Sequence, residues 1–146
     1  MTDKIDVAAQ ERHRMIAETA YFLVQERGFT GGDPVADWIE AERRVDRQLW
    51  AIATARMVQR LEAGVAAAAK QLGALKRRAS TLAASARTDL IAEVNKLDAL
   101  KLTLRNKLDE MRERGDQVSD KALHQVEKVW SEFSDALERA TARTQH

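Results

Sequence analysis

The chain has 146 residues, of which 45% are hydrophobic and only 5% aromatic, so its core must be built from Leu, Val, Ile and Ala. Six glycines and one proline are too few for the turns of a β-sandwich, and this composition favours helices. The absence of cysteine excludes disulfides, thiolate metal sites and cysteine nucleophiles. The 24 basic and 23 acidic side chains give a net charge of +1, so bulk charge indicates no particular partner.

No segment has the pattern of a signal peptide or of a membrane-spanning helix. Residues 1–10 carry several charges and contain no apolar run. The weakly polar stretch 63–69 is far shorter than the roughly 20 residues that a spanning helix needs. We therefore expect a soluble or at most peripheral protein, located in the cytoplasm.

Two helices joined by a glycine-containing loop are expected at the N-terminus. The first ends after Arg27, because Gly28 can adopt the left-handed conformation that terminates a helix. Asp33 is a good N-cap, and Pro34 suits the first position of the next helix. A loop of about five residues makes the helices antiparallel, which predicts an αα-hairpin. The residues expected to shape it are Tyr21, Gly28, Phe29, Asp33, Pro34 and Trp38, with the three rings packing across it.

The second helix of this hairpin is expected to have an apolar side and a charged side. Its acidic residues Asp37, Glu42 and Asp46 lie among arginines, and we interpret them as ordinary surface ion pairs. Paired carboxylates serve acid–base catalysis only where a pocket raises one pKa, and the sequence indicates no such pocket. The apolar side is expected to contain Val35, Trp38, Ile39, Val45, Leu49 and Ile52.

This region contains a series of short motifs at fixed offsets from one another: Ile16-Ala17, Ala20-Tyr21, Arg27-Gly28, Gly32-Asp33-Pro34, Asp37-Trp38 and Ala41-Glu42. Together they resemble the signature of the bacterial domain-of-unknown-function family 2934, over about residues 11–46. The resemblance implies a small helical module that is often attached to other segments. It implies no catalytic residues.

The remainder of the chain, residues 49–146, shows the seven-residue apolar periodicity of helices packed along one another. Its phase slips within residues 83–89, which fits either a continuous helix or a turn between two helices. A second slip predicts a break near residues 115–119. The seam residues are Leu61, Val65, Leu72, Leu75, Leu82, Leu97 and Leu104. We thus expect an all-α protein, with a helical hairpin over 1–48 and long amphipathic helices in coiled-coil-like or bundle packing over 49–146.

Charge is segregated along the chain. The net charge is −3 over residues 1–48, +6 over residues 49–88 and −2 over residues 89–146. The basic middle segment fits pairing with an acidic helix, adsorption to an anionic membrane or storage granule, or binding to nucleic-acid phosphates. The candidate basic surface contains Lys70, Lys76, Arg77 and Arg78.

No set of residues has the spacing of a catalytic, cofactor-binding or metal site. His13, His124 and His146 are far apart and lack the helical spacing of metal ligands. The loop 31–33 lacks the Lys and Ser or Thr that complete a phosphate-binding loop. We expect no enzyme activity, no cofactor and no metal.

A long helix beginning at Pro34 cannot bury its heptad seam against the first helix alone. It must pack on the C-terminal half of the chain, on a second copy or on another protein. The preferred function is a non-catalytic helical scaffold or adaptor that self-associates through heptad-patterned helices, as a homo-oligomer or with a protein partner. The alternative is a peripheral amphipathic coat protein on an anionic membrane or storage granule, similar to phasins in composition, and nucleic-acid binding ranks third.

Overall fold

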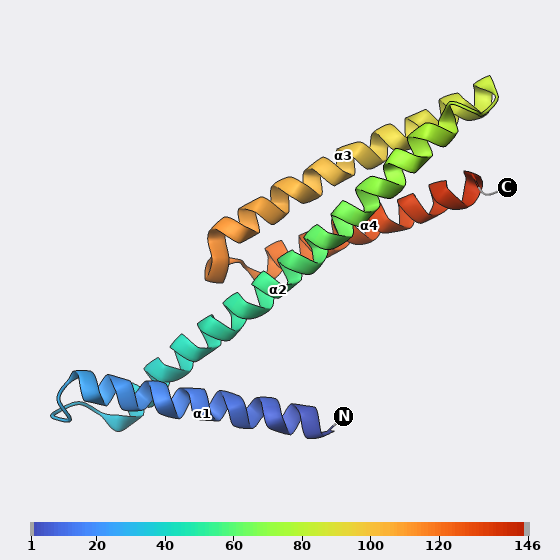
Figure 1. The fold of residues 1–146 in the computed structure, drawn as a ribbon. Coiled ribbons are helices and arrows are strands. Elements are labelled where there is room, and N and C mark those ends of the chain that lie inside the picture. Colours follow the sequence, from blue (N-terminus) through green and yellow to red (C-terminus); the bar gives the residue numbers. More distant parts are fainter. Residues whose placement is uncertain (1, 145–146) are drawn as a thin grey trace. The chain divides into compact units, whose positions relative to one another are not determined.

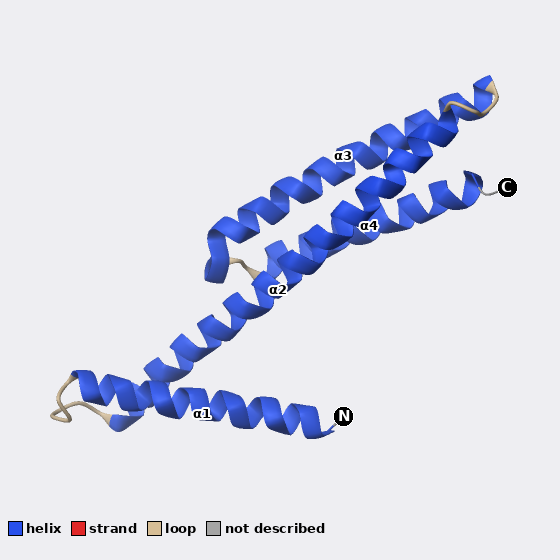
Figure 2. Cartoon of the chain, viewed as in Figure 1, coloured by secondary structure: helices blue, strands red, loops and turns tan. Residues whose placement is uncertain are grey.

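The computed structural model describes residues 2–144, with side chains from residue 8 onward, as four α-helices (Figure 1). They are α1 (Thr2–Glu26), α2 (Pro34–Ala79), α3 (Ala84–Arg114) and α4 (Asp120–Thr144), and the short 3-10 helix η1 (Gly115–Gln117) follows α3. Figure 2 shows helices joined by loops and no strand in this described part. The predicted all-α class is confirmed.

The chain divides into two compact units, Met1–Ala53 and Thr54–His146. Helix α2 contributes its first part to unit 1 and the remainder to unit 2. Within residues 2–144, no helix combines the length and hydrophobicity required to cross a bilayer.

Unit 1 is the predicted αα-hairpin of α1 and the first part of α2. Ile16 of α1 packs with Ala41 and Val45 of α2, and all three are almost fully buried. Half-buried neighbours extend this small core: Met15, Ala20, Leu23, Trp38 and Leu49.

Helix α1 ends as predicted, at a left-handed glycine. Gly28 has a φ of 69°, and its N–H donates to the carbonyl of Gln25 at 2.9 Å. The N–H of Phe29 donates to the carbonyl of Val24 at 3.0 Å. This pair of bonds is the Schellman motif, which satisfies carbonyls that the helix end would otherwise leave without donors.

Helix α2 begins as predicted, at Asp33 and Pro34. The Asp33 carboxylate accepts a hydrogen bond from the N–H of Val35 at 3.0 Å. The Asp33 carbonyl accepts one from the backbone N–H of Asp37, also at 3.0 Å. Proline in the first helical position has no N–H to leave unsatisfied. Asp33 is therefore the N-cap of α2.

Several apolar side chains predicted inside the hairpin lie on its surface instead. Tyr21 and Phe29 are 56% and 59% exposed, so the prediction that their rings pack across the hairpin is wrong. Two packed helices bury one stripe of each, and apolar residues outside that stripe stay in water. Exposed apolar residues of α2 in the same unit are Val35, Ile39 and Ile52.

Unit 2 is a three-helix bundle made by the rest of α2, α3 and α4 (Figure 1). Residues 80–83 form a turn, so the phase slip at 83–89 reflects a change of helix. The predicted break near 115–119 coincides with η1 and the loop before α4. All seven seam residues lie in or against one core: Val65, Leu72, Leu75, Leu97 and Leu104 are buried, and Leu61 and Leu82 are half-buried. The heptad seam is thus buried within the chain itself.

Candidate functional site

An ion pair between Arg27 and Asp37 closes the hairpin loop. Two guanidinium nitrogens of Arg27 donate to the two carboxylate oxygens of Asp37, and Asp37 is only 7% exposed. The Arg27 guanidinium lies directly against Gly32, where a Cβ atom would overlap it. These hydrogen bonds lower the pKa of Asp37 and raise the pKa of Arg27. Asp37 is therefore a buried loop anchor, and its interpretation as an ordinary surface pair is wrong.

A second ion pair links the two helices of unit 1. Arg12 Nε and Nη2 donate to the two carboxylate oxygens of Asp46 at 2.9 and 3.0 Å. The hydrogen bond from Arg12 lowers the pKa of Asp46. Asp46 thus pairs across the hairpin, with a residue 34 positions away, where the sequence predicted pairing along α2. A general acid needs a raised pKa, so neither Asp37 nor Asp46 is suited to that role.

Three aromatic side chains meet on the outside of unit 1 and form what we call the aromatic surface. The ring centroids of Tyr21 and Phe22 are 6.0 Å apart, and those of Tyr21 and Phe29 are 5.8 Å apart. All three residues are more than half exposed. The sequence pattern does not single out Phe22 as a surface residue. Its exposure could have been expected from helical geometry. The side chains of adjacent residues such as Tyr21 and Phe22 point about 100° apart, so the narrow contact with one neighbouring helix cannot bury both.

The basic residues predicted as a surface divide into two groups in unit 2. Lys76 Nζ lies 3.0 Å from Asp98 Oδ2, and Arg78 Nη1 lies 3.2 Å from the hydroxyl oxygen of Thr144, so both are engaged within the bundle. For Lys70 and Arg77, both exposed, the described residues provide no ion-pair partner. The predicted basic surface is therefore only partly free.

Two further arginines, Arg56 and Arg60, lie on the same outward side of α2 as Lys70 and Arg77. The helical period places these four opposite the buried seam, and the described residues offer no ion-pair partner to any of them. Exposed alanines occupy the positions between them, at 63, 66 and 67. We call Arg56, Arg60, Lys70 and Arg77 the basic stripe.

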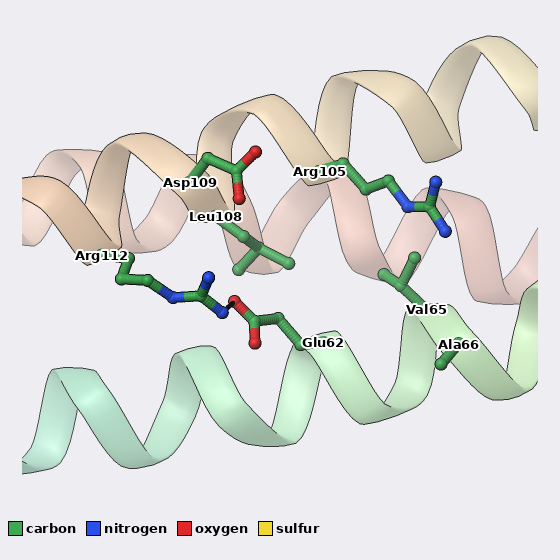
Figure 3. Close-up of a pocket in the computed structure, with 7 residues that line it drawn as sticks. All are labelled: Glu62, Val65, Ala66, Arg105, Leu108, Asp109 and Arg112. Carbon is green, nitrogen blue, oxygen red and sulfur yellow. Dashed lines mark hydrogen bonds and ion pairs between the residues drawn. The ribbon is translucent and has the colours of Figure 1, made fainter.

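Shallow hollows lie between the helices of unit 2. One, between α2 and α3, has a volume of about 200 Å³ and Val65 and Leu108 among its lining residues (Figure 3). An ion pair between Arg112 and Glu62 spans it. Another, between α3 and α4, has about 260 Å³ and contains the ion pair of Arg143 with Glu93. Both volumes are below the roughly 300 Å³ at which small-molecule pockets begin, and each hollow contains an ion pair that links two helices.

The structure gives the two described histidines, His13 and His124, no shared site. The ring of His13 packs on Trp38, with centroids 5.2 Å apart, and His124 Nδ1 lies 3.6 Å from Glu127 Oε2. His146 lies outside the described residues. Among residues 2–144, no three His, Cys, Asp or Glu side chains come together as a metal would require.

The fold and these surfaces define a small all-helical protein in which a helical hairpin precedes a three-helix bundle. Residues 11–47, which make up most of the hairpin, match the model of a family described as a protein of unknown function, DUF2934. The resemblance inferred from the hairpin motifs is thereby confirmed. The match stops before the bundle begins. Neither the curated proteins nor the solved structures gave a match to this chain.

Proposed function

We propose that this protein is a non-catalytic helical scaffold or adaptor that self-associates. The observation that supports this function is a pair of solvent-facing surfaces that can bind each other: the aromatic rings of unit 1 and the cationic side chains of the basic stripe of unit 2. Residues 1–53 carry seven basic and ten acidic side chains, and residues 54–146 carry 17 and 13. The two units thus have net charges of −3 and +4, which favours contacts between unlike units of different molecules.

The heptad seam has a different role in this proposal from the one expected from the sequence. Leu72, Leu97 and Leu104 are at most 2% exposed inside unit 2, so they are not accessible to another molecule. Their burial stabilises the bundle, by roughly 1.5–3 kcal/mol for each fully buried leucine. We therefore assign self-association to the outward surfaces.

The coat protein remains the second candidate, because the basic stripe is free to face an anionic surface. A helix that lies on a membrane inserts its apolar side, and the apolar side of α2 is packed in the core of unit 2. Coating a membrane or storage granule would therefore require the bundle to open. Nucleic-acid binding by the same stripe ranks third, and all three candidates assume a cytoplasmic protein, which cell fractionation tests.

Light scattering coupled to size-exclusion chromatography tests the proposal at several protein concentrations. We expect masses above the 16.4 kDa of the monomer, increasing with concentration. A constant 16.4 kDa at all concentrations would contradict self-association. Flotation with anionic vesicles and titration with DNA at low salt are the parallel measurements, and binding to either by a monomeric protein would favour the corresponding alternative.

A further inference from the structure

We propose that the aromatic surface of unit 1 docks on the basic stripe of unit 2 in a second copy of the chain. This inference rests on the proposed function and specifies the two surfaces that carry it. Each molecule then offers one surface of each kind, so molecules associate head to tail.

The aromatic surface has the properties of a binding site and little role in the hairpin core. Tyr21, Phe22 and Phe29 are 56%, 57% and 59% exposed, whereas the core of unit 1 is formed by other residues. Aromatic side chains are enriched among the residues that dominate binding energy at interfaces. Phe29 also has a φ of 59°, a conformation that is unfavourable for a bulky residue. Residues in strained backbone conformations cluster at functional positions.

The basic stripe is chemically complementary to this surface. Guanidinium groups stack on aromatic faces, and Arg56 and Arg60 are one helical turn apart, which spaces them by about 5–6 Å. The neighbouring ring centroids of the aromatic surface are 5.8 and 6.0 Å apart, so each arginine can cover one ring. The exposed alanines at positions 63, 66 and 67 allow another helix to approach α2 closely.

Charge favours a second copy's stripe over a second copy's aromatic surface. Glu26 lies one turn after Phe22, and the described residues give it no ion-pair partner, whereas Glu18, one turn before Tyr21, pairs with Arg14 at 2.9 Å. A symmetric contact between two aromatic surfaces would bring these carboxylates together, which is unfavourable. The contact with the stripe instead places Glu26 beside cations that have no ion-pair partner among the described residues, and the whole units have net charges of −3 and +4.

Two double variants of the full chain test this docking by light scattering. Tyr21→Ala with Phe22→Ala removes two of the three rings of the aromatic surface, and Arg56→Glu with Arg60→Glu reverses the charge at two of the four positions of the basic stripe. We expect each variant alone to be a 16.4 kDa monomer, and an equimolar mixture to form dimers, because one intact contact remains per pair. The matched control, Arg105→Glu with Arg139→Glu, changes two other exposed arginines of unit 2 and should assemble like the wild type.

The chain has no cysteine, which permits a second test with single cysteines. When the Phe22→Cys and Ala63→Cys proteins are mixed under oxidising conditions, we expect disulfide-linked dimers that contain one copy of each. A predominance of Phe22→Cys homodimers would show a symmetric contact and overturn the inference. This test does not depend on the double variants. It can therefore be carried out even if a double variant unfolds, as shown by loss of its helical circular dichroism signal.

The outcomes separate this inference from the proposed function. A wild type that is monomeric at every concentration contradicts self-association and the docking together. A wild type that assembles while both double variants also assemble contradicts the docking alone. Double variants that are helical and monomeric, and that stay monomeric when mixed, show that a single contact between an aromatic surface and a basic stripe does not join two molecules, and they also contradict the docking.

Discussion

In the hairpin loop, the role of Asp37 depends on a residue ten positions earlier in the sequence. Local patterns place it in the first turn of α2, where it would be an exposed carboxylate. The Schellman motif at Gly28 turns the chain so that Arg27 reaches Asp37 and pairs with both of its oxygens. Local sequence therefore predicts the turn and the cap, whereas the ion pair depends on where the turn directs the chain.

The pairing of Asp37 predicts a pH dependence of unit 1. The hydrogen bonds from Arg27 lower the pKa of Asp37 from its ordinary 3.8, so in acid the unfolded chain binds a proton more readily than the folded chain. This contribution to stability is fully present above about pH 4 and disappears as the pH falls through the lowered pKa. We expect Asp37→Asn to lower the thermal midpoint at pH 7 and to lose less stability than the wild type between pH 7 and pH 3.

Thermal unfolding followed by circular dichroism at both pH values measures this difference. Asp46 and Glu11 also have lowered pKa values, so the variant retains part of the acid sensitivity. Glu40→Gln is the control, because among the described side chains Glu40 pairs with Arg44 alone, one turn away and largely in solvent, and this variant should behave like the wild type. An equal loss of stability in Asp37→Asn and the wild type would refute the prediction.

Among the helices of unit 2, the contact between α2 and α4 depends on a glycine. A Cβ atom at Gly64 would lie 2.6 Å from the Cη2 atom of Trp130, whose ring therefore packs directly on the α2 backbone. Glycine inside a helix costs about 1 kcal/mol relative to alanine. The close approach of the Trp130 ring leaves no room for a Cβ atom at position 64, and this explains why α2 has a glycine there despite its cost to the helix.

Substituting Gly64 tests this packing. We expect Gly64→Ala to destabilise unit 2 by about 1 kcal/mol. The steric cost of the added methyl group against Trp130 exceeds the stability gained from the higher helix propensity of alanine. In a Trp130→Ala background the same substitution should stabilise by about 1 kcal/mol, and chemical denaturation of the four proteins measures the coupling.

Gly73→Ala is the matched control for this cycle. A Cβ atom at Gly73 would lie 3.6 Å from Arg77 Nη1, an ordinary contact, so alanine should stabilise by about 1 kcal/mol in both backgrounds. An equal effect of Gly64→Ala with and without Trp130 would disprove the contact.

At the scale of the whole molecule, the chain consists of two compact units with separate cores. Leu104 is fully buried in the core of unit 2, and Leu→Ala substitutions at such sites cost 2–5 kcal/mol in other proteins. We expect Leu104→Ala to destabilise unit 2 by about 3 kcal/mol and to leave the transition of unit 1 unchanged.

Tryptophan fluorescence separates the two transitions during denaturation when one variant keeps Trp130 and another keeps Trp38, with the other two of the three tryptophans, Trp50 included, replaced by phenylalanine. Trp130 reports on unit 2, and Trp38 reports on unit 1. The control is Leu102→Ala on the same helix, where the side chain is 59% exposed and its loss should have little effect. If both fluorescence signals shift together in Leu104→Ala, the chain unfolds as one cooperative unit.

The local sequence was sufficient to predict the all-α class, the capped loop, the break after α3 and the seam residues, since these depend on short-range hydrogen bonds and helical periodicity. It left open whether the chain turns or continues as one helix at residues 83–89. It was not sufficient to predict which surface the seam faces or which apolar residues remain exposed. It also missed the ion pair of Arg12 with Asp46, and it did not single out Arg56 and Arg60, to which the described residues offer no ion-pair partner.

These features depend on contacts between residues that are distant in sequence. A heptad pattern shows that one side of a helix needs a neighbour, but the same pattern fits an intramolecular bundle and an oligomer. In this chain, the turn at residues 80–83 and the break at η1 let α3 and α4 fold back and fill that position. The surfaces left for partners are therefore those that the hairpin and the bundle do not cover.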